Sequence, residues 1–321
     1  MPDLLYEAVD VLIFDPVTDS RSVLRAALNA LGFRNVDGVA TPADFASVIS
    51  YRHPDLVFCE VNALDSEICQ HIQSLRWGVA GYNPFTVIAA TSWDKSEALI
   101  RQVINAGADD VILRPFSQGI LAERIETMTL RRKGFVITYD YIGPDRRRDP
   151  GRNTADLFVP PNTLHMKAAE RLTTQATDKR LDRELPQARH HVLDEKLRVD
   201  AFQLGVLYRF LNDGIPTGEP VQSVTEKVDM LANALAHESS EAKRPDLVMW
   251  CNQAHYAVDM LRNTSEHDSG LRFLERAAKK VYHLVRPSDT PEAYEAALDN
   301  AMASIRARQT RAGQPERRTG T

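Results

Sequence analysis

The chain has 321 residues, which is enough for about two domains at roughly 150 residues each. Its 39 Lys and Arg residues and 44 Asp and Glu residues give a formal net charge of −5, so the overall charge does not favour a polyanionic partner. The first residues carry acids where a secretory signal carries bases, and no apolar run approaches the length of a membrane span. We therefore expect a cytoplasmic protein with no membrane partner.

Short apolar runs alternate with amphipathic helical stretches from Val9 to Ile125. This alternation is typical of βα units wound into a parallel sheet. The runs expected to form strands are 11–14, 35–36, 56–59, 86–90 and 111–113. Thr41, which precedes Pro42, and Ser117 are suited to cap helices. Residues 1–130 are therefore predicted to be an α/β domain with a five-stranded, doubly wound parallel sheet.

The pattern changes after Arg131. Residues 131–162 lack helical periodicity and contain many Gly, Pro, aromatic and basic residues, which indicates a linker arm. Its candidate interaction residues are Phe135, Tyr139, Tyr141, Arg146, Arg147 and Arg148. Residues 163–310 carry apolar side chains three and four apart, which predicts an all-α helical bundle. Residues 311–321 are polar and are expected to be a disordered tail.

The first domain resembles the receiver domain of bacterial response regulators, which have a CheY-like, flavodoxin-like fold. The resemblance covers residues 8–130 through the stretches IFDPVTDSRSVLRAALNALGF, PDLVFCEVNAL, VIAATS and GADDVILRPFS. It implies a role in two-component or phosphorelay signal transduction. In that family an acidic pair after the first strand binds Mg²⁺, and an aspartate at the end of the third strand accepts the phosphoryl group. A hydroxyl residue and a lysine after the fourth and fifth strands contact the phosphate.

By this resemblance the family's site falls on Asp15, Pro16, Glu60, Thr91 and Arg114. Pro16 offers no side-chain ligand to a hard dication, so the affinity for Mg²⁺ should fall sharply. The extra methylene of Glu60 displaces its carboxylate, and phosphoryl transfer tolerates little displacement. Arg114 is suited to form a fixed ion pair with Glu60. We therefore expect a pseudo-receiver domain that lacks normal aspartate phosphorylation.

Two other interpretations of these polar residues stay open. They could be inherited side chains that satisfy one another's hydrogen bonds without a signalling role. Alternatively, Asp15, Glu60 and the Asn62 carbonyl could hold a metal ion. No other metal site or cofactor is expected, because Cys59, Cys69 and Cys251 lack metal-ligand spacing and are predicted to be buried as small hydrophobic residues.

No enzymatic activity is expected, because the chain has no Gly-rich phosphate loop, nucleophile elbow, zincin motif or dinucleotide fingerprint. His237 and Glu238 superficially resemble the phospho-acceptor pair of histidine kinases. However, the Pro kink that follows in that family and any ATP-binding motif are missing. His237 is therefore expected to be a solvated residue near a helix end.

The predicted function is that of a non-enzymatic signalling adaptor which binds other signalling proteins, such as a histidine kinase or a response regulator. A second copy of the chain, bound in a homodimer, is another candidate partner. One alternative is a nucleic-acid-binding regulator that acts through Arg146, Arg147 and Arg148, although interspersed acids make this signal weak. The other alternative is a response regulator with an atypical phospho-acceptor.

Overall fold

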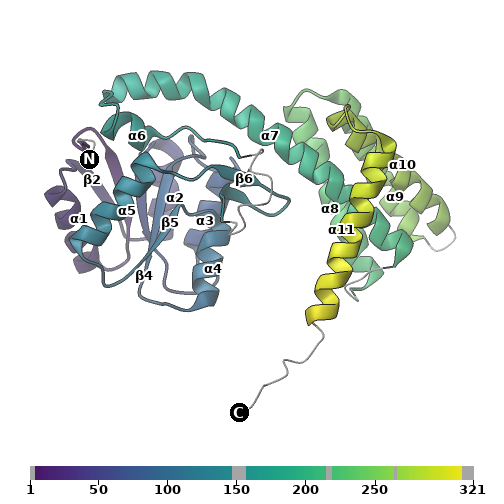
Figure 1. Cartoon of the computed structure of the whole chain (residues 1–321), viewed down its shortest axis with the longest axis horizontal. Coiled ribbons are helices and arrows are strands. Elements are labelled where there is room, and N and C mark those ends of the chain that lie inside the picture. Colours follow the sequence, from purple (N-terminus) through teal and green to yellow (C-terminus); the bar gives the residue numbers. More distant parts are fainter. Residues whose placement is uncertain (1–3, 147–156, 215–218, 264–265, 313–321) are drawn as a thin grey trace, which may run out of the picture. The chain divides into compact units, whose positions relative to one another are not determined.

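The computed structural model describes residues 4–146, 157–214, 219–263 and 266–312. The chain divides into two compact units, Met1–Arg189 and His190–Thr321. Figure 1 labels most of the elements. In chain order they are β1 Asp10–Phe14, α1 Thr18–Ala30, β2 Asn35–Val39, α2 Pro42–Tyr51, β3 Leu56–Glu60, α3 Glu67–Arg76, β4 Val87–Ser92, α4 Glu97–Ala106, β5 Asp110–Leu113, α5 Gln118–Leu130, β6 Phe135–Ile137, β7 Ile142–Pro144, α6 Thr163–Ala168, α7 Thr174–Asp213, α8 Val221–Glu241, α9 Pro245–Arg262, α10 His267–Val285 and α11 Pro291–Ala312.

The first unit is built on a parallel sheet with the strand order β2-β1-β3-β4-β5. This is the flavodoxin-like doubly wound order, so the predicted fold class is confirmed. Alternate residues of β1 face opposite sides of the sheet. Leu12 and Phe14 join the core under α2, α3 and α4, whereas Val11 and Ile13 join the core under α1 and α5. The short run at 35–36 also forms its strand, which continues to Val39.

Several helices of this unit begin at capping side chains that the sequence makes visible. The Thr41 side chain accepts a hydrogen bond from the backbone N–H of Asp44, and the Ser117 side chain accepts one from Ile120. Each bond satisfies one of the backbone donors that the first turn of a helix leaves without a partner. These caps fix where α2 and α5 begin, after β2 and β5 respectively.

The first unit extends well beyond residue 130. The described parts of the arm form an antiparallel hairpin, β6 and β7, and Phe135 also pairs with Phe158. α6 buries Leu164 and Ala168 in the same core as α1 and α5. The predicted start of the helical domain at residue 163 is therefore corrected. Residues 163–189 belong to the first unit, because the apolar side of α6 is needed to complete its core.

The second unit contains the predicted all-α bundle, formed by the C-terminal part of α7 with α8 to α11. Leu204, Val228, Val258 and Leu274 bring the first four of these helices into one core. α11 packs closely on α7 at Gly205, where a Cβ atom would lie 2.1 Å from the Tyr294 hydroxyl. Among the described residues, every helix is too short or too polar to cross a bilayer. Residues 313–321 of the predicted tail lie outside the described residues.

Candidate functional site at the carboxyl edge of the sheet

The residues of the predicted phospho-acceptor site meet at the carboxyl edge of the sheet. Asp15 follows β1, Glu60 ends β3, and Thr91 is paired with Glu60 in β4. Arg114 follows β5. These four side chains are 7% exposed or less, whereas Pro16 is exposed at the start of the turn into α1. The strand order places the four residues together, because parallel strands end at one edge of a sheet.

The guanidinium of Arg114 is bound mainly to Asp15. Its Nη2 donates to Asp15 Oδ2 at 2.8 Å and to Thr91 Oγ1 at 3.1 Å, while its Nη1 lies 4.0 Å from Glu60 Oε1. The expectation that Arg114 pairs chiefly with Glu60 is therefore corrected. The physical reason is that one nitrogen reaches both Asp15 and Thr91 at hydrogen-bond distance, and the other approaches Glu60 only at the outer limit of an ion pair.

The Glu60 carboxylate is the charge of the site that the Arg114 guanidinium neutralises least, because Arg114 lies closer to Asp15. Burial raises the pKa of Glu60, and the adjacent Asp15 carboxyl raises it further. A hydrogen bond with Asn62 and the charge of Arg114 act in the opposite direction but do not cancel these effects. A single arginine thus faces two buried carboxyl groups. Proton uptake by Glu60 relieves the excess negative charge.

The donor set does not fit a magnesium ion. Asp15 Oδ2 is bound by Arg114, and Asp15 Oδ1 accepts the backbone N–H of Val17 at 2.9 Å. Pro16 contributes no side-chain oxygen, and the Asn62 side-chain oxygen accepts from Ser92 and Trp93. Within the described ranges, no three His, Cys, Asp or Glu residues are grouped so that they could hold a metal ion. A hard dication prefers several free oxygen ligands, whereas here the Asp15 carboxylate is already bound by the Arg114 guanidinium.

Two neighbours of the site, Ser92 and Trp93, were not singled out from the sequence. Asn62 Oδ1 accepts hydrogen bonds from Ser92 Oγ at 3.1 Å and from the Trp93 backbone N–H at 2.8 Å, which ties the β3–α3 loop to the β4–α4 loop. The Arg114 guanidinium lies 5.9 Å from the centre of the Trp93 ring, and that ring is 54% exposed. Trp93 therefore offers a large apolar surface beside the buried ion pair. Trp93 follows β4 directly, and this position was the signal in the sequence that could have identified it as a neighbour of the site.

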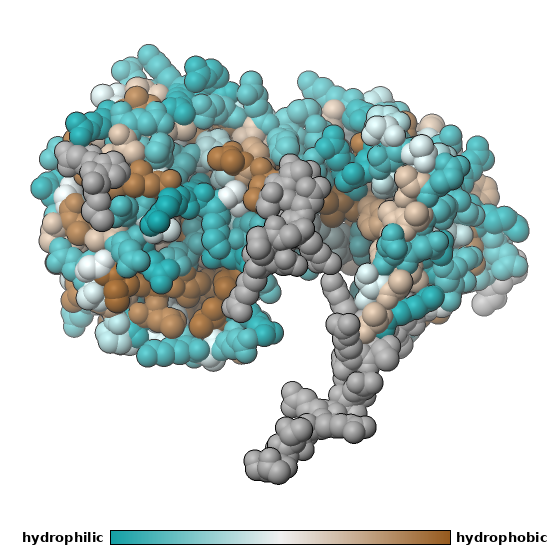
Figure 2. All heavy atoms as spheres, in the orientation of Figure 1, coloured by the Kyte–Doolittle hydropathy of each residue, from teal (hydrophilic) through white to brown (hydrophobic). Residues whose placement is uncertain are grey.

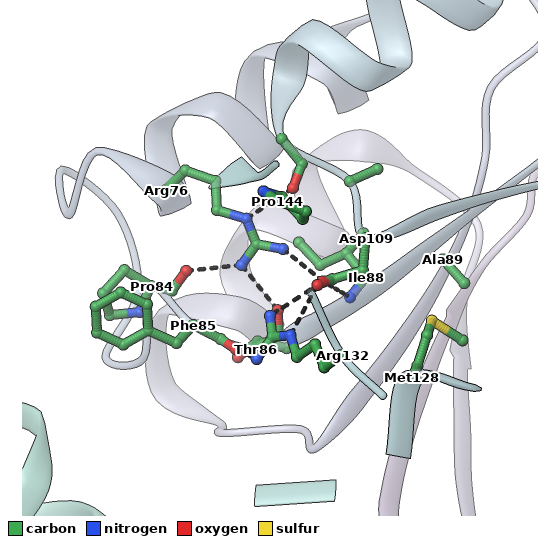
Figure 3. A network of polar contacts seen from close by, with 12 residues as sticks. Arg76, Pro84, Phe85, Thr86, Ile88, Ala89, Asp109, Met128, Arg132 and Pro144 are labelled. Carbon is green, nitrogen blue, oxygen red and sulfur yellow. Dashed lines mark hydrogen bonds and ion pairs between the residues drawn. The ribbon is translucent and has the colours of Figure 1, made fainter. Parts of the chain in front are cut away.

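Arg132 and Pro144 of the arm lie at the opposite, amino edge of the sheet, close to Asp109 (Figure 3). Asp109 Oδ2 accepts from Arg76 Nη2 at 2.9 Å, from Arg132 Nη2 at 3.1 Å and from the Ile88 backbone N–H at 2.8 Å. Arg132 Nε donates to Asp109 Oδ1 at 2.7 Å. Burial would raise the pKa of Asp109, but the guanidiniums of Arg132 and Arg76 hold it below its usual value.

Phe135 anchors the arm in this network. Its ring is completely buried, with the guanidiniums of Arg76 and Arg132 at 5.2 and 5.1 Å from its centre. Arg146 Nη2 donates to the backbone carbonyls of Ala108 and Asp109, so Arg146 is bound to its own domain rather than offered to a partner. Such contacts to buried carbonyls satisfy acceptors that the loop would otherwise leave unpaired.

The remaining arm residues differ from one another. Tyr141 is half-buried and donates its hydroxyl hydrogen to the Pro144 carbonyl at 2.8 Å, while Tyr139 is 38% exposed. Arg147 and Arg148 lie outside the described residues. The sequence pattern placed Arg132 in a basic cluster of the arm but gave no sign that Asp109 and Arg76 would share its charge, since the three residues come from separate segments.

Known proteins resemble part of this chain. No family model matches the chain. The swarming motility regulation protein RssB of Serratia marcescens is 27% identical over 128 residues, which are 40% of this chain and 56% of that protein. The chain thus spans little more than half the length of this curated relative.

Solved structures with a likeness to the chain include a response regulator from Thermotoga maritima, at 27% identity and a TM-score of 0.33, which covers 38% of this chain and 97% of that one. Another is the chemotaxis protein CheY4 of Vibrio cholerae, at 18% identity and a TM-score of 0.33, with 37% and 96% covered. Over about two fifths of its length, the chain is similar to the receiver domains of response regulators.

Proposed function

We propose that the chain is a non-enzymatic signalling adaptor whose receiver-like domain works without aspartate phosphorylation. The observation that carries this proposal is the position of Arg114. Its Nη2 binds both the Asp15 carboxylate and the Thr91 hydroxyl. In the receiver family those two positions serve the metal and the phosphoryl group, so an internal cation takes the place of the ligands that switch the domain.

The charge of the site supports the same proposal. A phosphoryl group on Glu60 would place about two negative charges next to Asp15, where the ionised carboxylate carries one. Without a metal ion, Arg114 would be the only cation among the four buried residues to balance them. The raised pKa of Glu60 shows that even one carboxylate is poorly compensated there. Phosphoryl transfer at this position would therefore need charge compensation that these side chains do not supply.

As an adaptor, the protein would act by binding other signalling proteins, for example a histidine kinase or a response regulator. The carboxyl edge has features suited to protein contacts, since Val17, Leu64 and Trp93 are each more than half exposed there. Elsewhere on the face drawn in Figure 2, hydrophilic side chains predominate on both units. Large apolar side chains around a charged centre are common at the core of protein–protein contacts.

The test compares the wild-type chain with a variant in which the family's pattern is restored by Pro16→Asp, Glu60→Asp and Arg114→Lys. Each protein is incubated with acetyl phosphate or beryllofluoride and Mg²⁺, and is then analysed by intact mass and by amide NMR. We expect the wild-type protein to stay unlabelled and its spectrum to stay unchanged. The restored variant should gain Mg²⁺-dependent shifts around residues 15, 60, 91 and 114.

Stoichiometric labelling of wild-type Glu60 would contradict the proposal and would favour the atypical phospho-acceptor instead. If both proteins fail to respond, the restored variant must first be shown to be folded by its amide spectrum. A folded but unresponsive variant would mean that substitutions outside these positions also block the chemistry, which still supports a domain that works without phosphorylation.

A further inference from the structure

A buried cluster of charged side chains lies inside the helical bundle, between α7 and α8. Lys196 Nζ donates to Asp200 Oδ2 at 2.9 Å and also to Glu238 Oε1. Asp200 is 1% exposed and Glu238 is 8% exposed, and the adjacent Leu197 and Leu235 belong to the apolar core of the bundle. The cluster is therefore part of the interior of the second unit and is independent of the receiver-like site.

The cluster contains one more acid than it has bases. When all three groups are ionised, one ammonium faces two carboxylates, which leaves an excess negative charge in a buried environment. Asp200 Oδ1 and Glu238 Oε2 are also buried, and neither has a hydrogen-bond partner among the described residues. Each carboxyl group thus has one oxygen bound to Lys196 and one oxygen that lacks a donor.

A single proton would satisfy both deficits. Lys196 Nζ binds both carboxyl groups, so they are neighbours, and the Glu238 side chain lowers the pKa of Asp200 as a hydrogen-bonding partner. A proton taken from solvent onto Glu238 Oε2 or Asp200 Oδ1 would create an O–H donor for the other carboxylate and would remove the excess charge. Lys196 would stay charged, since the two acids outweigh the opposing effect of burial and raise its pKa.

Other titratable groups around Glu238 do not replace this proton. Burial raises the pKa of Cys251, on α9, to about 12, so its thiol stays neutral near pH 7. Glu241, on α8, contributes a further negative charge and is itself 60% exposed. Burial raises the pKa of Glu238 to about 7, although Lys196 opposes the shift.

We propose that Asp200 and Glu238 form a proton-binding site beside Lys196, so that α7 and α8 pack more stably when one proton is bound than when both carboxylates are ionised. In the folded chain Glu238 binds its proton more tightly than in the unfolded chain, where its pKa is about 4.5. The stabilising effect of this group is therefore fully present below about pH 4.5 and is lost as the pH rises through about 7.

Hydrogen exchange of the full-length protein tests the proposal. Protection of α7 and α8 amides is measured at about pH 6 and about pH 8.5 and is corrected for the intrinsic exchange rate. We expect protection in the wild-type bundle to fall roughly tenfold or more at the higher pH. Glu238→Gln, which keeps the shape of the protonated acid, should stay protected at both values. The matched control, Glu226→Gln on the exposed side of α8, should keep the wild-type pH response.

An equal pH response in wild type and in Glu238→Gln would overturn the proposal. A carboxyl ¹³C NMR titration of the wild-type chain needs no variant and decides the same question if Glu238→Gln does not fold. A Glu238 resonance that titrates at an ordinary glutamate value would overturn the proposal, whereas one that titrates near neutral pH would support it.

Discussion

The two edges of the parallel sheet each bury a network of arginine and carboxylate groups, but the balance of charge is opposite. At the amino edge, Arg76 and Arg132 both donate to Asp109. At the carboxyl edge, Arg114 alone serves Asp15 and Glu60. Cations exceed acids in the network around Asp109, and acids exceed cations in the network around Arg114.

This difference sets the protonation behaviour of Asp109 and of Glu60. The two guanidiniums lower the pKa of Asp109 although burial opposes them, so Asp109 stays ionised and bound. Burial and Asp15 raise the pKa of Glu60, so its charge is the one that can change. The amino edge is therefore suited to hold the arm in place, and the carboxyl edge is suited to respond to its surroundings.

Asp109→Asn should have the largest effect, because it leaves two buried guanidiniums without a counter-charge. We expect a loss of about 3–5 kcal/mol in the free energy of unfolding of the first unit. Urea unfolding followed by tryptophan fluorescence in a Trp250→Phe background reports on this unit through Trp77 and Trp93. The control is Asp37→Asn, which breaks the exposed pair with Arg52 and should cost less than about 1 kcal/mol. Equal losses in the two variants would refute the assigned role of Asp109.

Arg114→Met should have a smaller but clear effect. It removes the charged hydrogen bonds to Asp15 and Thr91, while Asp15 keeps the backbone N–H of Val17. We expect a loss of about 2–3 kcal/mol in the same unfolding measurement. Arg101→Met, which breaks an exposed helix pair with Glu97, should change stability by less than about 0.5 kcal/mol. If Arg114→Met leaves the free energy of unfolding unchanged, the ion pair does not stabilise the carboxyl edge.

Gly107→Ala tests how the arm docks at the amino edge. Gly107 has a φ of +98°, and a Cβ atom would lie 2.8 Å from the Ile142 carbonyl oxygen of β7. Gly78 also has a positive φ, +72°, but a Cβ atom there meets nothing within 4 Å. We expect Gly78→Ala to cost about 1 kcal/mol through backbone strain alone, and Gly107→Ala to cost about 1–2 kcal/mol more. Equal costs would show that β7 does not pack tightly on this loop.

Glu60→Gln should have the smallest effect, and its sign should depend on pH. The raised pKa means that ionised Glu60 destabilises the folded chain as the pH rises above the ordinary value of 4.5. The variant should therefore gain stability relative to wild type as the pH increases from about 5 to about 8, in unfolding curves recorded at each pH. Glu67→Gln, at the first turn of α3, is the control that should lack this trend. A constant difference across the pH range would contradict the raised pKa.

The sequence alone determined the type and order of the elements from β1 to α5. Strand runs such as 56–59, and the capping side chains Thr41 and Ser117, are local signals that tertiary contacts did not override. The positions of Asp15, Glu60, Thr91 and Arg114 after successive strands were also readable, because the parallel topology requires such residues to meet. The sequence likewise indicated the all-α character of the second unit.

Only the tertiary structure decided which charges pair. Arg114 binds Asp15 rather than Glu60, Arg146 binds the backbone of its own domain rather than an external partner, and residues 163–189 join the first unit. Glu238 is buried beside Lys196, although the sequence placed it next to an exposed histidine. The physical reason is that long charged side chains choose their partners by differences of a few tenths of an ångström in the distances between segments far apart in the chain. Hydrophobic periodicity contains no information about those distances.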